Sequence, residues 1–270
     1  MSPHFRFLHL LLVCVILLGS AAGCSSRSTS IRPGEAGLAP LPTWPGADLP
    51  IVSIGEDHLG NLRQLTTGES ARDVVWSADG ATLLYTSRHS PDSTERIFAV
   101  QSVGGVETMR APQLLSSGRA LTADPGRDGL SDDGERIVYA SRPNEPVRVT
   151  SMPARRHDSN SGALELRIAR ADGRDDRAIT ANGATNLAPA FFPGRSDRII
   201  FSSNLADPQG RNFDLWAVNA DGTGLERLTY HPAFDGFASL SPDGRRIAFA
   251  SSRHAGRPGE RNVFVADWIP

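Results

Sequence analysis

The chain has 270 residues, of which 28 are basic and 30 acidic, and its formal net charge is −2. A weakly acidic protein has no electrostatic attraction for nucleic acid, so a nucleic-acid partner is not expected. Every basic residue is arginine, which excludes mechanisms that need a lysine, such as Schiff-base chemistry. The length suits one all-β domain with a sizeable core.

The first 23 residues have the layout of a secretory signal peptide. Arg6 provides a positive start, Leu10–Leu18 is an unbroken apolar run, and small residues follow up to Gly23. A membrane-spanning helix needs about 20 apolar residues, so an uncleaved anchor is the less favoured alternative. We therefore assign residues 1–23 to a signal peptide that is removed.

Cys24 is the candidate lipidation site. Residues 21–24, Ala-Ala-Gly-Cys, resemble the bacterial lipobox, although Ala21 stands where leucine is commonest. Cys14 would leave with the signal peptide, and a secreted protein with one remaining cysteine needs an explanation. The resemblance implies that Cys24 is acylated, and Ser25 after it implies sorting to the outer membrane, facing the periplasm. More than one acyl chain would make this anchor stable.

Residues 24–50 are expected to be a flexible tether. They are rich in serine, proline, glycine and alanine and show no periodic apolar pattern. Such a composition cannot bury a core and favours an extended linker. The folded domain is therefore assigned to residues 51–270.

A fourfold internal repeat decides the fold of this domain. Three copies contain a turn ending in Asp-Gly, with an aromatic residue five positions after the glycine, and the third copy in chain order is looser. The copies cover residues 75–88, 130–142, 191–204 and 240–251. Each continues with a further apolar strand, at 97–100, 166–169, 215–218 and 263–266. Short strands with regular turns predict an all-β fold, and the absence of a sustained helical period predicts few helices.

The aspartates of the repeated turn, Asp79, Asp133 and Asp243, are interpreted as turn formers and not as catalytic acids. In Ser-Pro-Asp-Gly the proline presets φ, the aspartate bonds nearby backbone, and the glycine accepts a positive φ. Such a turn joins two antiparallel strands. The strands beyond it are apolar on both faces, which is typical of a propeller blade packed between two neighbours.

The repeat, with its closing Leu-Thr at 65–66 and 228–229 and Ile-Thr at 179–180, resembles the WD-like β-propeller repeat of TolB and its relatives. The resemblance covers roughly residues 51–269. TolB itself has an additional N-terminal α/β domain, six blades and no lipid anchor, and this chain has four recognisable repeats. Kinship alone therefore suggests a link to Tol-Pal-like envelope or transport systems.

The number of blades and the closure of the ring follow from the ends of the repeat. We expect a small propeller of four blades and leave a degenerate fifth blade open as an alternative. The last repeat stops after Trp268 without a closing strand, and residues 61–66 form a closing strand without a repeat before it. We predict that the N-terminal strand completes the last blade, so that the ring has no open edge.

One stretch, Tyr230–Phe237, is rich in aromatic and polar residues and is expected at the mouth of the propeller channel. His231 and Asp235 lie within it, and Asp73, Asn186 and Asp128 occupy roughly comparable places in other repeats. Polar groups that converge there would bind a ligand or partner. The alternative is a buried polar network that joins neighbouring blades.

The sequence contains no hydrolase elbow, phosphate loop or zinc-ligand spacing. We therefore expect no catalytic residue, metal or cofactor, and predict a binding or scaffold lipoprotein of the bacterial envelope. Its partner would be an envelope protein or a small ligand, and its contact with the membrane would be the lipid alone. The alternatives are a propeller enzyme, such as a lactonase or glycan-active enzyme, and a purely structural accessory of a transport complex.

Overall fold

The computed structural model describes residues 55–88, 96–103, 106–107, 113–114, 129–143, 162–207, 210 and 212–270. All of these belong to one unit that spans residues 44–270. The predicted signal peptide, Cys24, the tether and Asp128 lie outside the described residues. Within the described part, every regular element is a strand, as predicted. No helix there has the length and apolar character that crossing a membrane requires.

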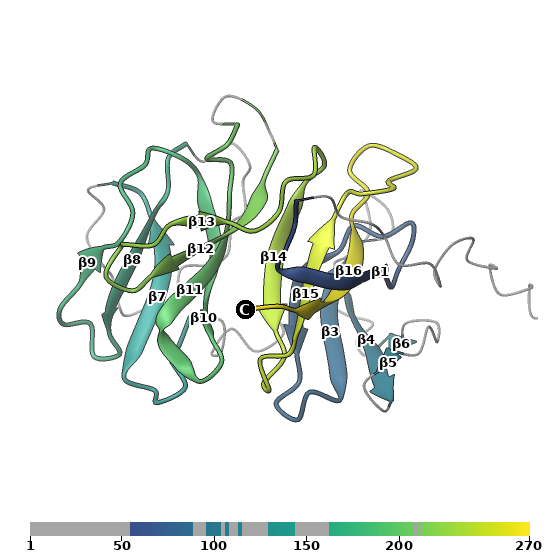
Figure 1. Cartoon of the computed structure of the whole chain (residues 1–270), viewed down its shortest axis with the longest axis horizontal. Helices are drawn as coiled ribbons and strands as arrows, with labels where there is room; N and C mark the ends of the chain where they lie inside the picture. Colours follow the sequence, from purple (N-terminus) through teal and green to yellow (C-terminus); the bar gives the residue numbers. More distant parts are fainter. Residues whose placement is uncertain are drawn as a thin grey trace, which may run out of the picture. The chain divides into compact units, whose positions relative to one another are not determined.

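The strands form four antiparallel sheets, one for each sequence repeat, which we number as blades 1 to 4 (Figure 1). Blade 1 contains β2 (Arg72–Trp76), β3 (Thr82–Ser87) and β4 (Arg96–Val103), with β5 (Val106–Glu107) and β6 (Gln113–Leu114) both paired to β4. Blade 2 contains β7 (Arg136–Ser141), β8 (Glu165–Arg170) and β9 (Arg177–Ala178). Blade 3 contains β10 (Asn186–Phe192), β11 (Arg195–Ser203), β12 (Asp214–Asn219) and β13 (Glu226–Arg227). Blade 4 contains β14 (Asp235–Leu240), β15 (Arg246–Ser251), β16 (Asn262–Trp268) and β1 (Leu59–Gln64).

Blade 4 is completed by the strand that comes first in the sequence. β1 pairs antiparallel with β16, with Leu59 opposite Trp268 and Gln64 opposite Phe264. The predicted pairing of the N-terminal strand with the last blade is therefore present, and the strand begins two residues earlier than predicted. Residues 65–66 lie just beyond it and stay attached, because Leu65 N–H donates to the Val263 carbonyl at 2.7 Å.

The recurring threonine after each closing strand has a structural explanation. The hydroxyl oxygens of Thr66, Thr180 and Thr229 each accept a hydrogen bond from a backbone N–H near the start of the next-to-last strand of the same blade, at 2.8 to 2.9 Å. All three threonines are buried, and a buried N–H without a partner is costly. The threonine hydroxyl therefore provides an acceptor for a backbone N–H at the point where the last strand of the blade has already ended.

The repeated aspartates form the hairpin turns. In blade 4, Ser241 Oγ and Arg245 N–H both donate to Asp243 Oδ1, and Asp79 and Asp133 accept the matching pair of bonds in blades 1 and 2. Gly80, Gly134 and Gly244 follow with positive φ near +70°. The hydrogen bonds from serine lower the pKa of all three carboxyl groups. The interpretation as turn formers is confirmed.

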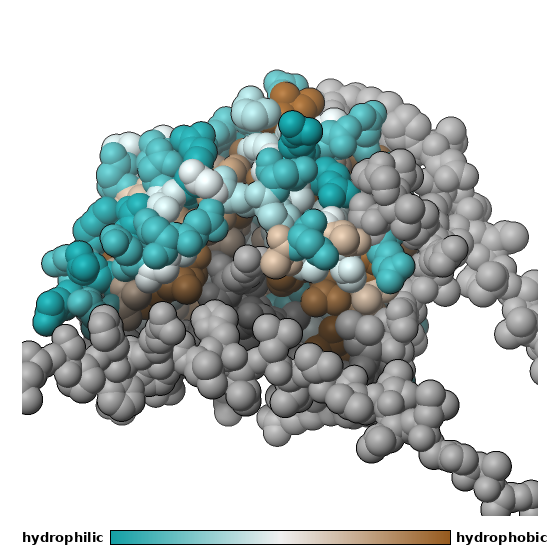
Figure 2. Space-filling model, turned by 90° about the horizontal axis from the view of Figure 1, so that it is seen from below, coloured by the Kyte–Doolittle hydropathy of each residue, from teal (hydrophilic) through white to brown (hydrophobic). Residues whose placement is uncertain are grey.

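Three hydrophobic clusters hold the blades together. One joins blades 1 and 4, a second joins blades 3 and 4, and a third joins blades 2 and 3. The described strands of blades 1 and 2 show no comparable packing on each other, so closure of the ring stays a prediction. Figure 2 shows that the described surface seen from below is mostly hydrophilic, with apolar side chains in small groups.

The first strand of blades 1, 3 and 4 carries the same irregularity. Asp73, Ala188 and Phe237 have φ values of 46°, 48° and 56°, and the register with the second strand shifts at each. Positive φ is uncommon for residues other than glycine, and its recurrence marks a β-bulge built into the repeat. Asp73 therefore corresponds to Phe237 and Ala188.

Candidate functional site

The loop before β14 and the start of β14 form the predicted mouth. His231 is half-buried, and its Nδ1 accepts a hydrogen bond from Ala233 N–H at 3.0 Å, which fixes the imidazole above the turn. Asn212 also donates to the His231 carbonyl. Burial, followed by the positive charge of Arg253, lowers the pKa of His231, so this side chain is neutral near pH 7.

Asp235 is completely buried at the first position of β14, and its carboxylate is held by Arg253. Arg253 Nε lies 3.1 Å from Asp235 Oδ1, and Arg253 Nη2 lies 2.6 Å from Asp235 Oδ2. Burial raises the pKa of Asp235, although the hydrogen bonds from Arg253 act in the opposite direction. Paired and bonded in this way, a buried charge is tolerated.

Glu56 completes the network on the other side of the same guanidinium. Arg253 Nη1 and Nη2 donate to the two Glu56 oxygens at 2.8 and 2.6 Å, and Tyr230 N–H donates to Glu56 at 2.8 Å. Although burial lowers the pKa of Arg253, its hydrogen bonds to Glu56 and Asp235 raise it above the ordinary value overall. The buried ion-pair network of Glu56, Asp235 and Arg253 thus ties the segment before β1 to blades 3 and 4.

Asp214, at the start of β12, is a further buried acid of this region. Its side chain is 1% exposed, and Arg227 Nη2 lies 2.9 Å from one oxygen. This contact between Arg227 and Asp214 does not have the geometry of a hydrogen bond. Neither oxygen of Asp214 has a hydrogen-bond partner among the described residues. Burial raises the pKa of Asp214 to about 6, against the attraction of Arg227, and the negative charges of Asp235 and Glu56 add to the increase.

Asn186 corresponds to Asp235 in the fold, as the sequence predicts. The two residues begin β10 and β14, and their register partners are Ser203 and Ser251. Asn186 is completely buried, accepts from Ser203 Oγ at 2.7 Å and donates to the Leu164 carbonyl at 2.7 Å. These bonds belong to a polar network between blades 2 and 3, so the structure places Asn186 in a separate network from Asp235.

Asp73 is not at the comparable position that the sequence suggested. By register with β3, Ala71 takes the place of Asp235 in blade 1, and Asp73 lies two residues further along at the bulge. Its carboxylate accepts from the Thr86 hydroxyl at 3.4 Å. Because blades 3 and 4 carry the same bulge, the bulge does not cause this offset; the polar residue of blade 1 simply stands two positions later in its strand.

The structure therefore brings His231 and Asp235 together and leaves Asn186 and Asp73 elsewhere. Glu56, Arg253, Asp214 and Arg227 are the residues that sequence reasoning missed. Arg253 follows the second strand of blade 4 as Ser-Ser-Arg, a signal that was available but had no visible partner. Among the described residues no group of histidine, cysteine, aspartate and glutamate has the arrangement of a metal site.

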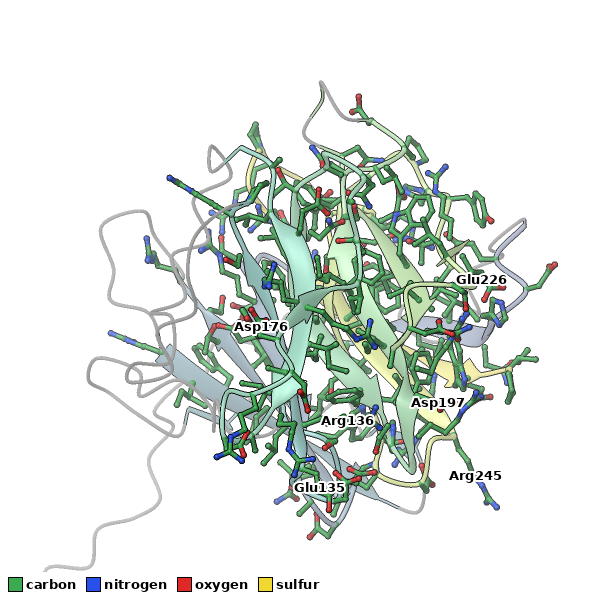
Figure 3. All side chains as sticks on the ribbon, turned by 90° about the vertical axis from the view of Figure 1, so that its left-hand side faces the viewer. Glu135, Arg136, Asp176, Asp197, Glu226 and Arg245 are labelled. Atoms are coloured by element: carbon green, nitrogen blue, oxygen red, sulfur yellow. The ribbon has the colours of Figure 1, made fainter. Side chains whose placement is uncertain are left out.

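The hairpin turns lie at one end of the blades, and the candidate mouth belongs to the other. Figure 3 shows Glu135 and Arg245, both in hairpin turns, at the lower end of the view. Glu226 on β13 lies higher, where it accepts from His58 and Arg198. The hairpin end therefore supplies control positions away from the candidate mouth.

The chain is similar to an uncharacterized bacterial protein and to several solved structures. No protein-family model matches the chain. An uncharacterized protein of Agrobacterium fabrum is 26% identical over 155 residues, which are 57% of this chain and 42% of that protein. Solved structures that are similar include a TolB-like protein of Agrobacterium tumefaciens, with 20% identity, a TM-score of 0.36, and coverage of 66% of this chain and 53% of that one. TolB of Acinetobacter baumannii has 18% identity, a TM-score of 0.37, and coverage of 73% and 41%.

The four antiparallel sheets have the blade architecture of a β-propeller, as the repeat predicts. TolB structures, which the repeat also resembles, are among the solved structures that are similar. An oligogalacturonate lyase in complex with manganese is also similar, with 14% identity, a TM-score of 0.37, and coverage of 76% of this chain and 66% of that one. The chain spans less than half of the curated relative and about half or less of the TolB structures. At these identities the similarity concerns the propeller alone.

Proposed function

We propose that this propeller is a non-catalytic binding or scaffold module of the bacterial envelope. Its partner, an envelope protein or a small ligand, would contact the mouth around His231. The observation that carries the proposal is the way this mouth is built. Arg253 donates to both Glu56 and Asp235 in the buried part of this region, while His231 and the 49% exposed Tyr230 reach the surface. A rigid base under accessible side chains suits recognition.

The burial and the hydrogen bonds of Asp235 support a binding function over catalysis. Both oxygens of Asp235 accept hydrogen bonds from Arg253, and the residue has no exposed surface. A general base must reach the proton that it removes, and this carboxylate is occupied. Asp235 thus serves as a structural support for the mouth.

The experiment is capture of partners from envelope extract by the wild type and by His231→Ala. We expect the variant to keep its melting temperature within a few degrees, because His231 lies outside the buried network, and to lose a partner that the wild type captures. Arg245→Ala, at the hairpin end, is the matched control and should capture as the wild type does. A His231→Ala, Tyr230→Ala protein that is stable and captures every wild-type partner would contradict the proposal. Capture of Tol-Pal components would define the finer role.

Attachment to the outer membrane through Cys24 is the second part of the proposal. The lipobox-like residues 21–24 and the unpaired cysteine support it. Wild-type cells should incorporate labelled palmitate into the protein and retain it with the outer membrane, whereas Cys24→Ser should lose the label and change fraction. A wild type that takes up no palmitate, or a variant that is processed and fractionates unchanged, would contradict it.

The alternative function is a propeller enzyme, such as a lactonase or glycan-active enzyme. One observation favours it: the pKa of Asp214 is raised to about 6, and perturbed acids concentrate at catalytic sites. Turnover of a lactone or glycoside by the wild type that Asp214→Asn abolishes would replace the binding proposal with this one.

A further inference from the structure

Two arginines meet where blade 4 packs against blade 1, beside the candidate mouth. Arg261 immediately precedes β16, and Arg72 begins β2. The backbone brings them together, because Ser70 and Arg261 form a parallel bridge. Arg261 N–H donates to the Glu69 carbonyl and Ala71 N–H donates to the Arg261 carbonyl, both at 2.9 Å. The strand entrances of the two blades are thus fixed to each other at this point.

The Arg261 side chain is held in place from one side. Its guanidinium carbon lies 4.5 Å from the centroid of the Phe234 ring, which is a cation–π arrangement. Phe234 in turn contacts Phe213 and Phe237, with ring centroids 5.7 Å apart in both cases. One face of the guanidinium is covered by an aromatic group that is itself packed, and its N–H donors form no side-chain hydrogen bond to a described residue.

Within the described part of the chain, neither arginine has an acidic partner. No carboxylate among the described residues forms an ion pair with Arg72 or Arg261, although both side chains are half-buried. The acids that flank them in the sequence are engaged elsewhere: Glu260 accepts from Gly68, Gly256 and Asn262, and Glu69 from Ser87. Burial, followed by repulsion from Arg72, lowers the pKa of Arg261 to about 10.

From this arrangement we infer that Arg72 and Arg261 form an anion-binding site for the carboxylate or phosphate group of a small ligand. Two adjacent positive charges that are half-buried without a counter-charge destabilise the folded chain, and an anion between them removes that cost. A guanidinium presents its donors in a planar fork that matches both groups. The inference rests on the proposed binding function and supplies its ligand class.

The test is thermal unfolding of the purified full-length protein with increasing inorganic phosphate or with succinate, at constant ionic strength maintained with sodium chloride. Constant ionic strength separates specific binding from general screening, and a ligand of the native state raises the melting temperature with concentration. We expect one or both anions to raise the melting temperature of the wild type. Phosphate alone or succinate alone would identify the group that the site prefers.

Substitutions then locate the binding. Arg72→Gln and Arg261→Lys should bind the anion about tenfold more weakly or lose it, the lysine because it lacks the planar fork. Arg245→Gln, at the hairpin end, should respond as the wild type does. Arg72→Glu should raise the melting temperature in chloride, because it gives Arg261 an internal partner, and should abolish the response to phosphate and succinate.

Two results would overturn the inference. One is a wild type with the same melting temperature in phosphate, succinate and chloride at equal ionic strength. The other is an Arg72→Gln protein, and an Arg72→Glu protein, that respond to anions as the wild type does. Because these measurements use purified protein and salts, they are independent of partner capture. The binding proposal can therefore fail while the anion site stands, and the reverse also holds.

Discussion

The two sides of blade 4 use arginine in opposite ways. Toward blade 3, Arg253 is 1% exposed and bonded to Glu56 and Asp235. Toward blade 1, Arg261 lies against Phe234 and is repelled by Arg72. The first arrangement is complete within the chain, whereas the second has no carboxylate partner among the residues that the structure describes. Two adjacent blades can therefore be joined by an ion-pair network that is complete, or they can leave a site where an anion from outside would fit.

Burial explains why Arg253 requires carboxylate partners within the chain. A charge without contact with solvent must be paired and hydrogen-bonded, or its desolvation costs several kcal/mol. Arg72 and Arg261 keep part of their hydration, so the folded state tolerates them without a partner. Four experiments test this difference, and the first removes β1 and Glu56 from the contact between blades 3 and 4.

The largest effect is expected from truncation. A protein that begins at Thr67 lacks β1, whose Leu59 and Leu62 belong to the core of blades 3 and 4, and it lacks Glu56. We expect a loss of unfolding free energy on the order of 5 kcal/mol or more, with aggregation through the exposed edge of β16. The control begins at Ile51 and should be as stable as the mature protein. An unchanged melting temperature on removal of β1 would show that β1 does not close blade 4.

Replacement of Arg253 separates the ion-pair network from the strand. Arg253→Met leaves Glu56 and Asp235 buried without their partner, so we expect a loss of about 3–5 kcal/mol in urea unfolding. The matched change on the other side, Arg261→Gln, should cost about 1 kcal/mol or less, because loss of the contact with Phe234 is offset by relief of the repulsion from Arg72. Equal losses in the two variants would mean that the two arginines are equivalent and that the comparison is wrong.

The pH dependence of stability tests the raised pKa of Asp214, which lies where blade 3 packs against blade 4. The pKa of Asp214 is about 6 in the folded chain against an ordinary value of 3.8, so the folded state binds this proton more tightly than the unfolded state. Its contribution to stability is complete below about pH 4 and is lost as the pH rises through about 6. Asp214→Asn should therefore gain, relative to the wild type, on the order of 2 kcal/mol between pH 4 and pH 7. A constant difference between the two proteins across this range would contradict the raised pKa.

The smallest effect is expected at the hairpin end. Asp243→Ala removes the acceptor of two hydrogen bonds in an exposed turn, from Ser241 Oγ and Arg245 N–H. The cost in thermal unfolding should be about 1 kcal/mol, with no change in the anion response or in partner capture. A loss of binding in a stable Asp243→Ala protein would move the functional surface to the hairpin end.

Much of the fold could be predicted because its signals are local. The turn Ser241–Gly244 needs only a serine, an aspartate and a glycine within four positions to form its bonds. The all-β class, the four repeats and the pairing of the N-terminal strand with blade 4 follow from such units repeated along the chain. The position of Asp73 was misjudged because similar polar residues were matched by type, whereas the strand pairing places Asp73 at the position that corresponds to Phe237, two residues after that of Asp235.

The candidate site depended on contacts between distant parts of the chain. The sequence by itself determined the strands, the turns and the place of His231 and Asp235 beside the same blade entrance. Only the tertiary structure decided that Arg253 meets Glu56, 197 positions away, and that Arg261 meets Arg72 and, among the described residues, no acid. Charge pairing acts over a few ångströms of space and takes no account of separation along the chain. Which arginine is neutralised and which is left for a ligand is therefore settled when the blades pack.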